Sequence, residues 1–422
     1  MIPLYLRVSC AKTINWQAAG LSLILAVPAL AEPLPLSVAL TRAAEADPAA
    51  DATYQRRRAA DAGIRQAGAR LNPAIGVDVE DALGSGAYSG IDRMETTVTY
   101  QQTLERGGKR DARIASASAQ RDLVTARGQV RVWSLMGEVH TLWIEATAAE
   151  ATVALAEERL TLARTAQAEI GRRVAAARDP LFAGSLADTD VANAEIARDQ
   201  AKAKAQQLKL QLAGYWGGGA DIDLDPAWLE DLSAAGAEPV VMETPDLALL
   251  RAQQRMASAD ISVETSRSVQ DPTLQAGIRH YQADNAFAFV IGGSIPLGRY
   301  NTNAGAIERS QAEAQAAAGD FAAAGRIRDR EIAASTIRMV NHAAEVRRID
   351  DQVIPQAQRA VAQVREGFAR GGFSYRDVMG AQEVLMAAKA RRLEVLKAFQ
   401  LERARRERLS GQWVALLPEV AQ

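Results

Sequence analysis

Cysteine and aromatic residues are scarce in this 422-residue chain, and each scarcity excludes a class of structure. The one cysteine, Cys10, lies in a segment that we expect to be removed, so the mature chain has no disulfide and no thiolate metal site. Aromatic residues make up 5% of the sequence although apolar residues make up 48%, because alanine fills much of the difference. Helices with this composition pack closely in long bundles rather than around a large globular core.

An excess of charge of one sign and a long apolar run are also absent. The formal net charge is −2, and it becomes −4 when residues 1–31 are removed, since they contain Arg7 and Lys12 and no acidic residue. A balanced, slightly acidic net charge gives no electrostatic case for binding nucleic acid, so we expect no nucleic-acid partner. After residue 31 no stretch approaches the roughly 18 apolar residues of a transmembrane helix, which leaves a barrel as the way to span a membrane.

Residues 1–31 read as a secretory signal peptide. Arg7 and Lys12 supply the positive region, Gly20 to Val27 the apolar region, and Ala29-Leu30-Ala31 a small-residue cleavage site. A membrane anchor is the alternative, but the apolar run is short for a span. The sequence therefore predicts an exported protein.

Catalytic and cofactor-binding patterns are missing as well. The three histidines, His140, His280 and His342, are scattered without metal-ligand spacing, and the methionines form no cluster. The glycines at 107–108 and 217–219 lack the context of a phosphate-binding loop. We therefore expect no enzyme, no cofactor and no metal site.

The chain contains the same arrangement twice, in residues 32–216 and 243–412. Each copy has two strand-like stretches, then a long helical tract, a break and a returning helical tract. Corresponding landmarks lie about 190 to 200 residues apart, so the repeat is a half-molecule. Residues 217–242 are expected to be a connector packed outside the bundle, and residues 413–422 a C-terminal tail.

The helical tracts are too long for a small globule. The tract of residues 110–177 contains no proline and would be about 100 Å long at 1.5 Å per residue. Apolar residues follow 3,4 spacing along it, which favours a coiled-coil seam: Val139, Leu142, Ala146, Ala149, Val153, Ala156, Leu160 and Ala163. The matching tract, 304–370, contains Pro355, where we expect a kink or a change of packing. The returning tracts are expected at 188–212 and 375–409, and shorter helices at 36–70 and 246–268.

Four stretches alternate between apolar and polar or small residues, as strands do. They are residues 72–80, 96–104, 272–281 and 287–297, each about the length of a tilted membrane strand. A soluble sheet with one wet face gives the same alternation. Because four strands cannot close a barrel, a membrane sheet would have to be shared among subunits, with eight strands in a dimer or twelve in a trimer.

The second break carries the most specific motif of the chain: Pro355-Gln356-Ala357, Phe368, Gly371, Ser374-Tyr375, Asp377-Val378 and Ala381-Gln382. In these residues the sequence resembles the second hairpin turn of the TolC family of outer-membrane efflux channels. The first half echoes them with Gly184-Ser185, Asp190-Val191 and Ala194-Glu195. The resemblance extends from about Leu36 to Gln412.

The segment Gln102 to Arg110, at the exit from the second strand, is similar to the heavy-metal cation branch of that family. Thr103 and Arg106 stand where that branch commonly has a proline and a leucine. The likeness implies a passive exit for divalent metal cations.

The resemblance further implies a mainly α protein with a membrane β part. Three chains would form a homotrimer with a 12-stranded β-barrel in outer-membrane lipid, four strands per chain, continued by an α-helical coiled-coil tunnel in the periplasm. A periplasmic adaptor and an inner-membrane efflux pump would be its partners. The alternatives are a periplasmic coiled-coil adaptor or scaffold protein, and the outer-membrane duct of a drug-efflux or type I secretion system.

The two turns, about 178–189 and 371–376, would form the periplasmic end. The resemblance implies a tunnel aperture near Asp377, Arg376 and Asp190, where a ring of carboxylates would attract cations. It also implies adaptor-docking turns around Gly184, Ser185, Gly371, Gly372, Ser374 and Tyr375. Asp377 has a second reading from the residues alone, because an acidic residue in the first turn of a helix caps it.

Overall fold

The computed structural model describes residues 33–418, so the expected signal peptide of residues 1–31 lies outside the described residues. The chain is mainly helical and carries one four-stranded sheet, as the sequence predicts. The first half contains α1 (Leu36–Glu45), α2 (Ala50–Ala67), β1 (Ala74–Glu80), β2 (Glu95–Thr103), α3 (Lys109–Ala175) and α4 (Leu181–Gly214). The second half contains α5 (Pro245–Arg267), β3 (Thr273–Tyr281), β4 (Ala286–Ser294), α6 (Ala304–Arg348), α7 (Ile354–Ala369) and α8 (Tyr375–Ser410).

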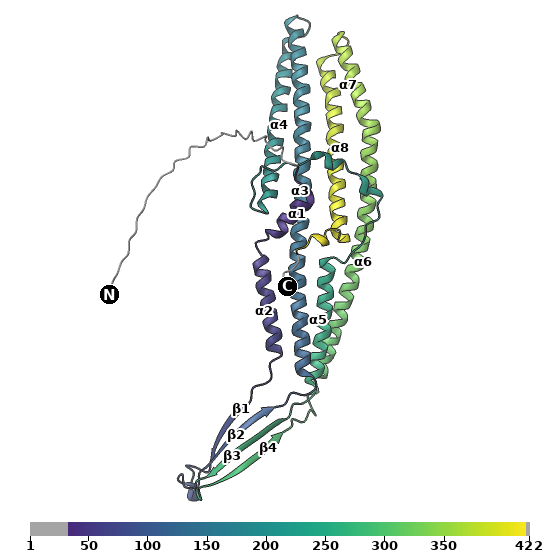
Figure 1. The fold of residues 1–422 in the computed structure, drawn as a ribbon. Coiled ribbons are helices and arrows are strands. Elements are labelled where there is room, and N and C mark those ends of the chain that lie inside the picture. The colour runs from purple at the N-terminus through teal and green to yellow at the C-terminus, as the bar shows by residue number, and fades with distance from the viewer. Residues whose placement is uncertain (1–32, 419–422) are drawn as a thin grey trace, which may run out of the picture. The chain divides into compact units, whose positions relative to one another are not determined.

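Helix α3 is the longest element and the one around which the others pack. Its 67 residues correspond to about 100 Å of helix. It packs against α4 over one part of its length and against α2 and α5 over another, while α8 also contacts it (Figure 1). All eight residues of the expected seam are buried or half-buried, which agrees with a helix that keeps one apolar face toward its neighbours.

Proline residues divide two of the expected helices. The helix expected at 36–70 is two helices, α1 and α2, because Pro48 cannot continue the backbone hydrogen-bond ladder. In the second half, α6 and α7 are joined by a π-helical turn, Ile349–Val353, and Pro355 lies in the first turn of α7. The wider turn accommodates a proline, which has no N–H to donate to the preceding turn.

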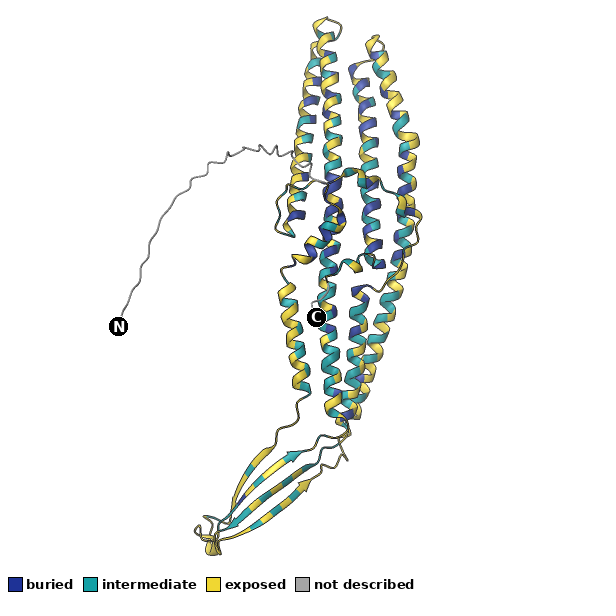
Figure 2. Cartoon of the chain, viewed as in Figure 1, coloured by how far each residue is buried: buried dark blue, intermediate teal, exposed yellow. Residues whose placement is uncertain are grey.

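The sheet has the order β1-β2-β3-β4 and is antiparallel throughout. The pairing of β2 with β3 joins the two halves of the chain. Strand β4 ends at Ser294, short of the expected Leu297, because Pro296 cannot donate to the ladder. One face of the sheet exposes large apolar side chains, among them Ile75, Val77, Val79, Phe287, Phe289 and Ile291. Figure 2 shows that most strand residues are exposed or half-buried.

Tight turns connect strands to helices at one end of the helical part. Gly107 and Gly108, between β2 and α3, have φ angles of +69° and +71°, a region that favours glycine. Lys109 pairs with Asp271 at 2.6 Å and so ties the start of α3 to the segment before β3. The segment Gln102 to Arg110 therefore has a structural role at this joint.

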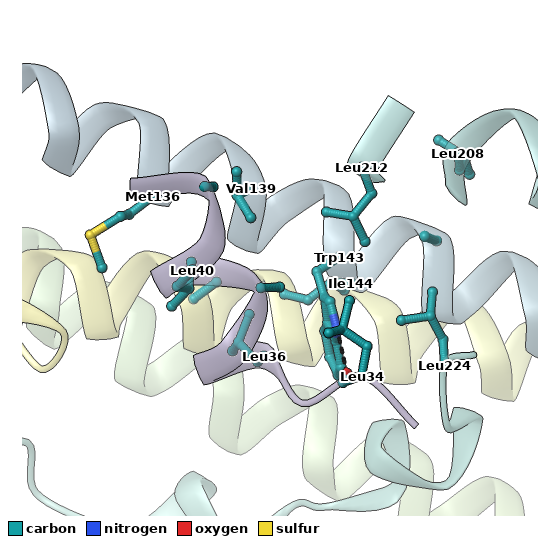
Figure 3. Packing of buried hydrophobic residues seen from close by; sticks show 14 of the residues in the cluster. Leu34, Leu36, Leu40, Met136, Val139, Trp143, Ile144, Leu208, Leu212 and Leu224 are labelled. Carbon is teal, nitrogen blue, oxygen red and sulfur yellow. Dashed lines mark hydrogen bonds between the residues drawn. The ribbon is translucent and has the colours of Figure 1, made fainter. Parts of the chain in front are cut away.

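The main apolar core lies where α1, α3, the end of α4 and the connector meet. Leu40, Ile144 and Leu212 are almost completely buried there, and the Trp143 indole N–H donates to the Leu34 carbonyl at 3.2 Å (Figure 3). The connector supplies Leu224 and Leu229 to this core, so it is more than the outer covering that the sequence suggested. Arg403 of α8 forms an ion pair at 2.9 Å with Asp231 of the connector.

Candidate functional site

The two hairpin loops lie at the end of the helices opposite the sheet, and they contain the residues that the sequence singles out (Figure 1). The first loop is shorter than the expected turn of residues 178–189. Helix α3 ends at Ala175 and α4 begins at Leu181, because the Asp179-Pro180 pair breaks the helix and lets it resume at once. Gly184 and Ser185 therefore lie inside α4 and not in a turn.

The second loop closes α7 with a left-handed glycine. Gly371 has a φ of +83°, its N–H donates to the Phe368 carbonyl at 3.0 Å, and the Gly372 N–H donates to the Gly367 carbonyl at 2.8 Å. This pattern satisfies the carbonyls at a helix end and suits glycine best. Gly371 and Gly372 thus fix the direction in which the chain turns toward α8.

Ser374 and Asp377 form a reciprocal cap at the start of α8. The Asp377 carboxylate accepts hydrogen bonds from the Ser374 N–H at 2.8 Å and the Ser374 hydroxyl at 2.7 Å, and the Asp377 N–H donates back to that hydroxyl at 3.4 Å. These bonds hold the pKa of the Asp377 carboxyl below its usual value. The capping role read from the residues is therefore present. Asp377 and its neighbour Arg376 are both exposed.

Tyr375 links the two hairpins. Its hydroxyl donates to the Asp190 carboxylate of α4 at 3.2 Å, and the residue as a whole is 7% exposed. Burial, followed by the negative charge of Asp190, raises the pKa of the Tyr375 hydroxyl, so it stays a neutral donor. From the sequence, Asp190 was expected near the aperture and Tyr375 in a docking turn. In the structure the two side chains are hydrogen-bonded to each other.

Apolar packing surrounds this bond. The buried cluster at the hairpin ends consists of Ala166, Ile170, Ala183, Ala187, Phe368, Tyr375 and Val378, drawn from both hairpins. Because side chains in such a cluster shield a hydrogen bond from water, the Tyr375–Asp190 contact is stronger than one on the open surface.

Arg173 is a second link between the hairpins, and the sequence analysis missed it. Its guanidinium donates to the Phe368 carbonyl at 2.7 Å, lies 4.2 Å from the centre of the Phe368 ring, and pairs with Asp179. A basic residue in the last turn of a helix is common, since it favours the helix C-terminus, so its type gave no specific signal. Its position opposite Phe368 becomes visible only when the hairpins are packed.

Among residues 33–418, no group of three or more His, Cys, Asp or Glu side chains could hold a metal ion. His140 is 3% exposed and its ring lies edge-on to Trp413 at 5.8 Å. Burial, with a smaller effect of the Arg403 charge, lowers its pKa to about 3. His140 is therefore a neutral packing residue at ordinary pH. In the same part of the chain, no helix is long and apolar enough to cross a membrane.

Comparison with known proteins shows which protein family the chain resembles. The outer membrane efflux protein family matches residues 39–218, which include the first strand pair and the whole of the first hairpin, α3 and α4. Over these residues the chain is similar to this family. The family's members are outer-membrane efflux proteins, and the prediction from the second hairpin turn is thereby confirmed.

Among curated proteins, the chain is similar to heavy-metal resistance proteins. It is 28% identical over 379 residues to the cobalt-zinc-cadmium resistance protein CzcC of Cupriavidus metallidurans, with 87% of each chain covered. It is also 28% identical over 313 residues to the nickel and cobalt resistance protein CnrC of the same organism, which covers 65% of this chain and 70% of that one.

Among solved structures, the fold is similar to those of several outer-membrane proteins. The outer membrane protein VceC of Vibrio cholerae matches with a TM-score of 0.68 and 19% identity over 89% of this chain and 96% of that one. CusC matches with a TM-score of 0.65 and 14% identity, over 90% of this chain and 91% of that one. These matches establish the fold over nearly all of the described chain.

Proposed function

We propose that three copies of this chain form an outer-membrane channel through which an efflux system releases divalent metal cations. The observation that carries the proposal is the sheet, which has an exposed apolar face and two edge strands, β1 and β4, that pair on one side only. An open sheet edge in lipid leaves backbone groups unsatisfied, so the strands must be completed by another subunit. Three copies give twelve strands around a lumen.

The cargo is inferred from the named relatives. The proteins CzcC and CnrC are named for resistance to cobalt, zinc, cadmium and nickel, and the identity to CzcC extends over most of both chains. A conduit does not need tight ligands, because an ion must leave as easily as it enters. Its role would therefore be passive, with no catalytic step.

The helical hairpins would extend into the periplasm and meet a periplasmic adaptor and an inner-membrane pump. In this arrangement the hairpin ends form the entrance. Asp190, Arg376 and Asp377 are candidates for its rim, and the two loops are candidates for adaptor docking. The Tyr375–Asp190 bond and the Arg173–Phe368 contact support this proposal, since both hold the hairpins of one chain together at the end where an entrance must open.

Metal sensitivity of a deletion strain tests the cargo. We expect loss of the gene to lower tolerance to cobalt, zinc or cadmium, to leave drug tolerance unchanged, and to be reversed by the wild-type gene. Sensitivity to drugs alone would contradict metal export and favour a drug-efflux duct.

A further inference from the structure

A single arginine connects three strands on the polar face of the sheet. Arg279 of β3 donates from Nε to the Thr97 hydroxyl of β2 at 2.9 Å. One terminal nitrogen pairs with Glu95 of β2 at 2.8 Å and the other with Glu80 of β1 at 3.1 Å. The planar guanidinium makes these contacts at once because its donors are fixed in a fork.

The strand register places all of these residues on one face. Asp78, Thr97 and Arg279 lie opposite one another across β1, β2 and β3, and Glu80 and Glu95 form part of the next row on the same side. The neighbouring positions alternate to the other face, which carries Val79 and Phe287 among its apolar residues. The charged group therefore belongs to the polar face of the sheet, opposite the apolar one.

Charge on this polar face is confined to the end of the strands that lies far from the helices. Nearer the helices the same face carries uncharged residues, namely Gly76, Thr99, Gln101, Thr273, Gln275, Gly277, Gly292 and Ser294. At the far end, three carboxylates (Asp78, Glu80 and Glu95) face one guanidinium, which is a net charge of −2 per chain.

We propose that Arg279 sets the ion preference of the outer end of the channel. This inference rests on the proposed trimer, in which the polar face lines the lumen and three chains form a ring of net charge −6. Such a ring attracts cations, but conduction also requires that cations leave. Arg279 partly neutralises the carboxylates. The ring therefore attracts cations but does not bind them tightly.

Two features favour a charge ring over a metal-binding site. The carboxylates of Glu80 and Glu95 are already engaged by the guanidinium, and among the described residues no acidic group has the arrangement of a metal site. Arginine also keeps its charge at every accessible pH, which makes it a constant opposing charge. Cations would thus pass this ring hydrated.

Reversal potentials of the purified trimer in a planar bilayer, measured across a KCl gradient, test the proposal. Arg279→Gln should raise the ratio of K⁺ to Cl⁻ permeability by about twofold or more, and Glu95→Gln should lower it. Arg279→Lys keeps the charge and should remain close to wild type.

The matched control is Arg299→Gln, which removes an exposed positive charge beyond the end of β4. The differences should shrink between 0.1 M and 1 M salt, as the Debye length falls from about 10 Å to about 3 Å.

Unchanged selectivity in a conducting Arg279→Gln channel would overturn the proposal. Equal shifts in Arg279→Lys and Arg279→Gln would also overturn it, because the geometry of the fork and not its charge would then be responsible. If Arg279→Gln fails to assemble, Glu95→Gln decides, since a ratio equal to wild type there contradicts a charge ring. A wild-type protein that does not conduct at all would instead contradict the proposed channel.

Discussion

At the scale of single residues, the Tyr375 hydroxyl joins the two hairpins at the end where we propose that the entrance lies. Tyr375→Phe removes the bond to Asp190 and keeps the buried ring. We expect a loss of about 1 kcal/mol in the interaction between the hairpins and a channel that opens more readily. Single-channel conductance measures the change. Tyr215→Phe is the control, since it removes a comparable bond to Glu138 at 3.3 Å between other parts of the helices. Equal effects of the two variants would contradict a specific role for Tyr375.

Asp377 gives a pH-dependent prediction at the same scale. Its folded-state pKa is below the ordinary value of 3.8, so its charge stabilises the folded chain above that pH and this contribution is lost as the pH falls through the folded pKa. Asp377→Asn should therefore be less stable than wild type at pH 7, and the difference should narrow below pH 3.8. Thermal unfolding across this pH range measures it. A difference independent of pH would show that the charge does not stabilise the cap.

Whether the sequence can predict a contact between two residues depends on how far apart they lie along the chain. The cap between Ser374 and Asp377 was predictable because it spans three residues. The contact of Arg173 with Phe368 spans 195 residues, and the pair Arg279–Glu80 spans 199. Such pairs become neighbours only through packing and strand register, which one sequence does not reveal.

At the scale of elements, the joint between β2 and α3 depends on two glycines with different surroundings. Both have positive φ, but a Cβ at Gly107 would lie 2.6 Å from the Val269 Cβ, whereas a Cβ at Gly108 would meet open space. Gly108→Ala should cost about 1–2 kcal/mol through backbone strain alone. Gly107→Ala should cost more, because Val269 must also move. The yield of folded protein and its melting temperature compare the two. Equal losses would contradict the close packing at this joint.

The pattern of apolar residues predicted the existence and type of these elements but not their ends. The length of α3 and the four strands followed from periodicity. The break at Pro48 was missed, and the turn at Pro180 was predicted but ends earlier than expected, because a proline can end a helix or lie at the start of the next one. Only the packed structure distinguishes the two outcomes.

At the scale of the whole molecule, the two faces of the sheet should respond differently to charge. Ile291 is 86% exposed on the apolar face, while Val290 next to it lies on the polar face. Ile291→Lys should lose about 2–4 kcal/mol if its position is near the middle of the membrane, and Val290→Lys much less. The amount of each variant recovered in outer membranes measures this. Similar recovery of both would contradict lipid contact by the apolar face.

The central claim is that three copies complete the sheet in the outer membrane, and native mass spectrometry of protein extracted from outer membranes tests it most directly. We expect a species of three times the mature chain's mass that dissociates to single chains on heating. Recovery of the protein only as a single chain in the soluble periplasmic fraction would contradict the account.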